Sequence, residues 1–108
     1  MIERESSRES KASPDDVVST VAKLLPLWTV DAGTLQRSVS CEDFRQAMSF
    51  INQVADEAEA LNHHPTWTNT YNRVQFTLTT HDADNQITDL DIELAQRIDL
   101  LAEEAGAN

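Results

Sequence analysis

All three histidines of this 108-residue chain fall between residues 59 and 81, and their positions could support acid–base chemistry. His63 and His64 stand side by side before Pro65, where an amphipathic helical pattern ends. His81 follows an alternating, strand-like run. Histidine is the only side chain whose unperturbed pKa, about 6.5, lets it both give and take a proton near neutral pH. Three histidines at the ends of two elements therefore indicate an acid–base site.

The same three histidines could instead bind zinc. Adjacent histidines at a helix end point in different directions, however, and nothing else in the sequence demands a metal, so no metal is expected. Cys41 is the only cysteine, which excludes an internal disulfide and disfavours a cysteine-based metal site. Cys41 lies beside a helix start, where a thiol could become reactive, but a small buried residue is the preferred interpretation.

The net charge of −11 limits the classes of partner. Phosphate backbones would repel such a chain, which disfavours nucleic-acid binding. An acidic surface could contact a basic protein partner, although acidity alone more often means only a solvated surface. No run of about 20 apolar residues could span a membrane. The start of the sequence lacks an apolar signal segment, which favours the cytoplasm.

Hydrophobic periodicity predicts the elements that must position the histidines. Residues 1–12 are polar and aperiodic and predict a disordered tail, followed by a single domain over residues 13–105. Residues 13–16 predict a helix start, with Ser13 as the cap and Pro14 at the first helical position. A hairpin is predicted over residues 28–39, with Gly33 able to take positive φ in its turn. The predicted buried stripe of the first helix consists of Val17, Val18, Val21, Leu24 and Leu25.

A second helix is predicted from residue 41 to Pro65, because proline disfavours the α region at the residue before it. Residues 66–71 and 74–79 predict two more strands, and residues 82–85 predict a turn. Thr88 is expected to cap a last helix, with Leu90, Leu94, Ile98 and Leu101 facing inward. The expected apolar face of the second helix is Phe44, Ala47, Met48, Ile51, Val54, Ala55, Ala58 and Leu61.

The resulting order is α-β-β-α-β-β-α. Two hairpins alternating with helices predict an α+β domain, with a four-stranded antiparallel sheet and the helices packed on one face. Ile92 and Leu100 lie off the main stripe of the last helix and weakly support a self-association surface.

The chain also resembles a known family, the pterin-4a-carbinolamine dehydratases. The positions that carry the resemblance are Glu59, His63, His64, Pro65, Tyr71, His81 and Asp91. The flanking residues 47–59 and 91–95 resemble the same family, and the similarity covers roughly residues 24–101. The resemblance implies the fold described above and assembly as a homodimer or homotetramer. It also implies loss of water from a 4a-hydroxytetrahydropterin to give the quinonoid dihydropterin, which a reductase recycles. The pterin is then the substrate, and no cofactor is implied.

Carried over position by position, the resemblance implies that His63 and His81 form an acid–base pair and that His64 orients the substrate ring. The implied substrate-binding residues are Asn62, His63, His64, Thr79, Thr80, His81 and Asp82. The hydroxyls of the two threonines, with nearby backbone groups, are expected to hydrogen-bond the amide-like edge of the pterin.

Three further residues are expected to support the site. Trp67 could provide a flat apolar wall, or could simply pack in the sheet as Tyr71 could. Glu59 lies one helical turn before His63 and could hydrogen-bond its imidazole, or could be a solvated helix residue. Asp91 could hold a histidine or could only cap the last helix.

A non-catalytic protein is the main alternative, because relatives of this fold act as a partner of a transcription factor or as assembly factors. The intact set of three histidines favours the enzyme, since a scaffold has no need to retain it. The acidic surface supports the alternative, and one protein could combine both roles.

Overall fold

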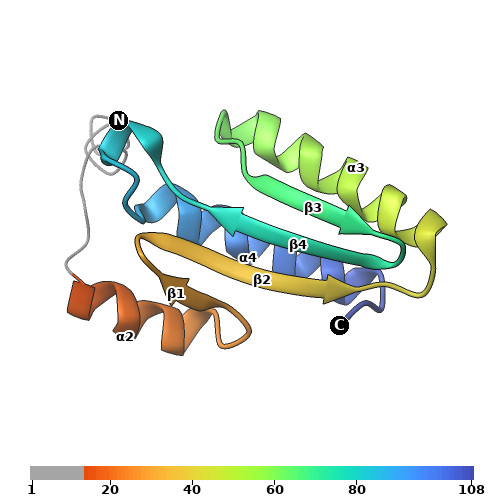
Figure 1. The fold of residues 1–108 in the computed structure, drawn as a ribbon, viewed down its shortest axis with the longest axis horizontal. Coiled ribbons are helices and arrows are strands. Elements are labelled where there is room, and N and C mark those ends of the chain that lie inside the picture. The colour runs from red at the N-terminus through yellow and green to blue at the C-terminus, as the bar shows by residue number, and fades with distance from the viewer. Residues whose placement is uncertain (1–13) are drawn as a thin grey trace.

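The computed structural model describes residues 14–108, so the predicted tail and the predicted cap Ser13 lie outside the described residues. The described elements confirm the order α-β-β-α-β-β-α and the α+β class (Figure 1). They are α2 (Pro14–Leu24), β1 (Thr29–Asp31), β2 (Thr34–Ser40), α3 (Phe44–Leu61), β3 (Thr66–Thr70), β4 (Arg73–Leu78), the 3₁₀ turn η1 (His81–Ala83) and α4 (Asp89–Glu104).

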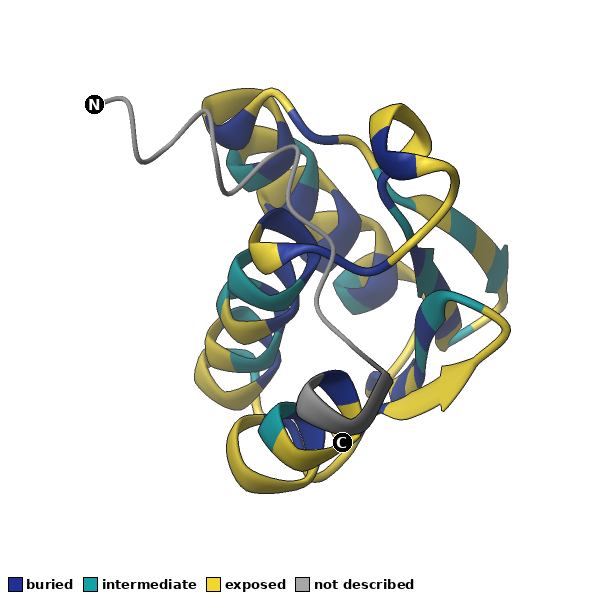
Figure 2. Ribbon diagram, turned by 90° about the vertical axis from the view of Figure 1, so that its left-hand side faces the viewer, coloured by how far each residue is buried: buried dark blue, intermediate teal, exposed yellow. Residues whose placement is uncertain are grey.

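The four strands form one antiparallel sheet in the order β1-β2-β4-β3. In β2 and β4 every second residue is buried, as expected for strands with one face covered. Helices α3 and α4 lie behind the sheet in Figure 1, and in Figure 2 the sheet is on the right and the long helices are on the left. Because β3 pairs with β4, the strand that follows His63 and His64 lies beside the strand that precedes His81.

The core is one continuous cluster between the sheet and the helices. Phe50 of α3 packs edge-on against Phe76 of β4, with ring centroids 5.8 Å apart, and this buried residue was absent from the expected face. Four residues expected in the core are exposed instead: Val18, Leu24, Phe44 and Met48. Because an α-helix turns by about 100° per residue, each helix buries a narrower stripe than the sequence suggested. On α2 that stripe runs every fourth residue, through Val17, Val21 and the following Leu25.

Side-chain contacts fix α4 against its neighbours. Asp99 of α4 pairs with the buried Arg37 of β2 and accepts a hydrogen bond from Trp28 Nε1 at 2.8 Å. Arg97 of α4 donates to Glu57 of α3 at 2.7 Å. These contacts matter for the site because α4 carries Asp91 at its start.

Cys41 is buried, which confirms its interpretation as a small packed residue. Burial, and then the charge of Asp43, raises the pKa of the thiol above its ordinary value. Within residues 14–108, no helix has the length and apolar character needed to cross a membrane.

Candidate active site

The end of α3 sends the two adjacent histidines in different directions. The helix ends at Leu61 because Asn62 adopts a left-handed conformation, with φ of 51°, which asparagine tolerates better than most residues. The N–H of His63 then donates to the carbonyl of Ala58 at 3.0 Å, which closes the helix end. As a result His63 is buried and His64 is exposed. The helix ends before the boundary that the proline predicted.

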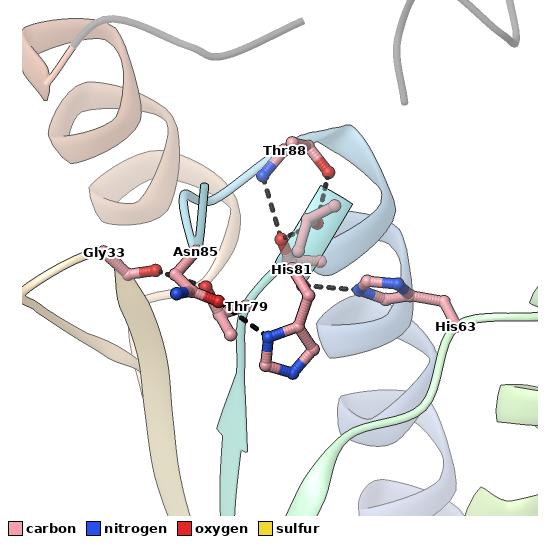
Figure 3. Close-up of polar contacts among 8 residues, drawn as sticks. Gly33, His63, Thr79, His81, Asn85 and Thr88 are labelled. Atoms are coloured by element: carbon pink, nitrogen blue, oxygen red, sulfur yellow. Dashed lines mark hydrogen bonds and ion pairs between the residues drawn. The ribbon is translucent and has the colours of Figure 1, made fainter. Parts of the chain in front are cut away.

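His63 is held by a buried carboxylate from the start of α4. Its Nε2 lies 2.6 Å from Oδ1 of Asp91, and the Asp91 side chain is fully buried. The other oxygen, Oδ2, accepts from the Thr80 hydroxyl at 2.6 Å and from the Thr88 backbone N–H at 2.9 Å. In Figure 3 dashed lines run from His63 and from Thr88 toward this cluster. A carboxylate only accepts hydrogen bonds, so Nε2 of His63 carries a proton and Nδ1 is the nitrogen left for a ligand.

Asp91 therefore has two roles. Its contact with the Thr88 N–H belongs to the capping box that starts α4, and its contact with His63 crosses 28 positions of sequence. The alternative that Asp91 only caps the helix is wrong. The structure instead supports the expectation that this residue holds a histidine.

The expected contact between Glu59 and His63 is also wrong. Oε2 of Glu59 lies 3.1 Å from Nε2 of His64, and both of these side chains are largely exposed. The left-handed residue Asn62 is the physical reason, because it breaks the helical spacing on which the expectation depended.

His81 is held differently, by a neutral side chain within its own turn. It begins η1 directly after the β4 region, and its Nδ1 lies 2.7 Å from the amide oxygen Oδ1 of Asn85 (Figure 3). An amide oxygen can only accept, so Nδ1 of His81 carries the proton and Nε2 is free to accept one. Asn85 was expected only as a turn residue. Its spacing of four from His81 within that turn is the one signal that could have identified it.

The three histidines line one pocket of about 190 Å³. Its lining residues are Asn62, His63, His64, Thr79, Thr80, His81 and Asp82. The structure thus brings together all the residues that the sequence suggested for substrate binding, and their roles in binding remain predictions. A larger hollow of about 520 Å³ between α2 and α4 contains no histidine, so it does not offer the same chemistry.

Some expected contributors lie elsewhere or are already engaged. The Thr79 hydroxyl donates to the carbonyl of Gly33 at 2.9 Å, and the Thr80 hydroxyl donates to Asp91. Both hydroxyl protons are therefore used inside the protein, and only the oxygens could accept from a ligand. Trp67 packs edge-on against Phe76, with ring centroids 6.3 Å apart, and does not line the pocket.

The geometry does not support the zinc alternative. Within the part of the chain that the structure describes, no three His, Cys, Asp or Glu side chains are placed to hold one ion. His63 and His81 each already commit one ring nitrogen, to Asp91 and to Asn85.

The chain is similar to members of one known protein family. The family model described as pterin 4 alpha carbinolamine dehydratase matches residues 10–101. A protein of Synechococcus sp. (strain WH7803), named "Putative pterin-4-alpha-carbinolamine dehydratase", is 47% identical over 88 residues, which cover 82% of this chain and 94% of that protein. A protein of the same name from Burkholderia orbicola (strain MC0-3) is 46% identical over 101 residues, covering 92% of this chain and 90% of that protein.

A solved structure shares the fold. It is described as a transcriptional coactivator/pterin dehydratase from Brucella melitensis, and it superimposes with a TM-score of 0.79 at 37% identity. The match covers 86% of this chain and 99% of that chain.

Proposed function

This chain belongs to the pterin 4 alpha carbinolamine dehydratase family, and on that premise we propose that it removes water from 4a-hydroxytetrahydropterins. The observation that carries the proposal is the pocket in which His63, His64 and His81 converge. In the elimination, the bond between C4a and the hydroxyl oxygen breaks, N5 loses its proton, and a double bond forms between C4a and N5. One proton is delivered to the leaving hydroxyl and one is taken from N5, so the products are water and the quinonoid dihydropterin.

The two anchored histidines suit the two proton transfers. The Asp91 carboxylate accepts from Nε2–H of His63 and so leaves Nδ1 as the unprotonated nitrogen, and we assign this Nδ1 to the N5 proton. The amide of Asn85 engages Nδ1 of His81, so we assign Nε2 of His81 to the second transfer, in which a proton is delivered to the leaving hydroxyl. Each transfer is worth about 10²–10⁴-fold in rate. The elimination of water involves no net oxidation or reduction, so it requires no redox cofactor.

The size of the pocket suggests which part of the substrate it holds. About 190 Å³ is below the roughly 300–1,000 Å³ that is typical of pockets for drug-sized ligands. The pterin ring would enter it, and the substituent on C6 would remain outside. The proposed substrate class is therefore 4a-hydroxytetrahydropterins with varied side chains, and exposed His64 would orient the ring at the pocket rim.

The oligomeric state and the place of the reaction in metabolism are also proposals. We infer a homodimer or homotetramer from the family resemblance and from the exposed apolar residues Leu24, Leu27 and Leu100. A place in tetrahydropterin recycling follows from the product, which a reductase could consume. The comparisons do not favour the non-catalytic alternative, and the coactivator role is stated of the Brucella protein.

The proposal is tested by following dehydration of freshly generated 4a-hydroxytetrahydropterin by absorbance, with and without the protein. We expect acceleration well beyond the spontaneous rate. His64→Ala should raise KM more than it lowers kcat, because that residue is assigned to orientation. If folded protein at a saturating concentration of substrate gives only the spontaneous rate, the proposed dehydratase activity is rejected.

A further inference from the structure

His81 has little besides Asn85 to fix the orientation of its ring. The residue is exposed and lies in a three-residue 3₁₀ turn, in contrast to the buried His63. The contact from His81 Nδ1 to Asn85 Oδ1, at 2.7 Å, is the hydrogen bond that the ring makes within its own turn. In Figure 3 the second ring nitrogen of His81 points away from Asn85. One amide therefore determines which nitrogen faces the pocket.

The backbone of Asn85 is itself held in place. Its N–H donates to the carbonyl of Thr80 at 3.1 Å, and the N–H of Thr80 donates to the carbonyl of Gln86 at 3.0 Å. Asn85 has a φ of 58°, in the left-handed region that asparagine tolerates better than most residues. The turn between β4 and α4 is thus closed around the residue that contacts His81.

The β1–β2 turn supports this loop from outside. A Cβ atom at Gly33 would lie 2.5 Å from the carbonyl oxygen of Asn85, so the two backbones approach as closely as glycine allows. The carbonyl of Gly33 also accepts from the Thr79 hydroxyl at 2.9 Å. A turn outside the pocket therefore contributes to the placement of Asn85.

We propose that Asn85 is a positioning residue: its amide oxygen holds His81 in the Nδ1–H tautomer and presents Nε2 to the pocket. This inference rests on the proposed function for its catalytic consequence, but not for its structural part. The amide oxygen fixes the position of the Nδ1 proton by accepting a hydrogen bond from it. Asn85 thereby gives His81 its orientation and leaves Nε2 as the nitrogen available to exchange a proton.

The test combines a measurement of the tautomer with one of catalysis. Histidine is labelled with ¹⁵N, and the ring-nitrogen shifts of His81 report which nitrogen is protonated; no substrate is needed. Asn85→Gly removes the amide and keeps a residue that accepts positive φ. Asn85→Asp keeps an acceptor oxygen, and Gln86→Ala, in the same exposed turn, is the matched control. His63, His64 and Asp82, the other titratable residues of the pocket, are unchanged in all variants.

We expect His81 to be the Nδ1–H tautomer in the wild type, in Asn85→Asp and in Gln86→Ala, and to lose this preference in Asn85→Gly. The kcat of Asn85→Gly should fall by about ten- to a hundredfold with little change in KM, because the reacting group loses its orientation. An Nε2–H tautomer in the wild type, or an unchanged tautomer in Asn85→Gly, overturns the proposal. A changed tautomer with unchanged kcat overturns it as well. A wild type without dehydratase activity rejects the proposed function, while the shifts still decide whether Asn85 holds His81.

Discussion

His63 and His81 line the same pocket but are held in opposite ways. His63 is buried and bound to the carboxylate of Asp91, whereas His81 is exposed and bound to the amide of Asn85. The Asp91 carboxylate also accepts from the Thr88 N–H in the capping box of α4 and from the Thr80 hydroxyl after β4, so the His63 side of the site is part of the fold. The His81 side is a local turn. The exposed contact between His81 and Asn85 can therefore be removed at little cost to stability, whereas the buried contacts of Asp91 cannot.

Asp91→Ala should have the largest effect on stability. The substitution removes the acceptor of three buried donors, on His63, Thr80 and the Thr88 backbone. The Thr80 hydroxyl can turn to the Thr88 hydroxyl at 2.7 Å, so His63 and the Thr88 N–H are the donors left unsatisfied. Because each unsatisfied buried donor costs about 1–3 kcal/mol, we expect the free energy of unfolding to fall by about 3 kcal/mol or more. Asn85→Gly should change it by no more than about 0.5 kcal/mol, as is usual for an exposed site.

Both variants are compared with the wild type by urea unfolding. If Asp91→Ala does not fold, Asp91→Asn keeps the size of the side chain and should show a smaller loss of the same sign. Equal stability of the Asp91 and Asn85 variants would contradict the view that only the His63 side belongs to the fold.

Thr80→Val removes one donor from the Asp91 carboxylate and also the contact between the Thr80 and Thr88 hydroxyls. The hydroxyl of Thr80 is buried and donates at 2.6 Å, while valine has nearly the same shape. We expect a loss of about 1–2 kcal/mol in the free energy of unfolding, since a hydrogen bond to a charged group is lost. Thr68→Val on the exposed face of β3 is the matched control, and it should unfold at nearly the wild-type urea concentration.

Gly33→Ala tests the support of the His81 side from outside the pocket. Gly33 has a φ of 82°, and an added Cβ would meet the Asn85 carbonyl oxygen. The left-handed conformation alone costs an L-residue about 1–2 kcal/mol. We expect a destabilisation of that size in thermal or urea unfolding, together with a shift of the His81 ring resonances. Unchanged resonances would show that the β1–β2 turn does not place Asn85.

Glu59→Ala should have the smallest effect. Its carboxylate contacts His64 at 3.1 Å, but both side chains are largely exposed, and such pairs contribute little. We expect a melting temperature close to that of the wild type and an unchanged kcat. A loss of kcat as large as that of a histidine variant would mean that Glu59 acts in the site after all.

The sequence predicted the parts of this molecule that depend on local patterns. The order of elements follows from periodicity, and the three histidines converge because they sit at the adjacent ends of α3 and β4. The partners of the histidines were not predictable in the same way. Asp91 reaches His63 across 28 positions, and the contact depends on how α4 docks against the sheet.

Other differences have equally specific causes. Asn62, in its left-handed conformation, ends α3 before the proline. As a result the Glu59 carboxylate contacts His64 and not His63. Phe44 is exposed because it is the first residue of α3, where the apolar pattern extends past the part of the helix that packs in the core.

Under the proposed function, His63 and His81 act together in one elimination although they are anchored differently. The decisive measurement is the dehydration kinetics of His63→Ala, His81→Ala and the double variant, each shown to be folded. We expect each single variant to lose about 10²–10⁴-fold in kcat. The double variant should be little slower than the worse single one, because residues that act together in one step are not additive. Wild-type kcat in either folded single variant would contradict the claim.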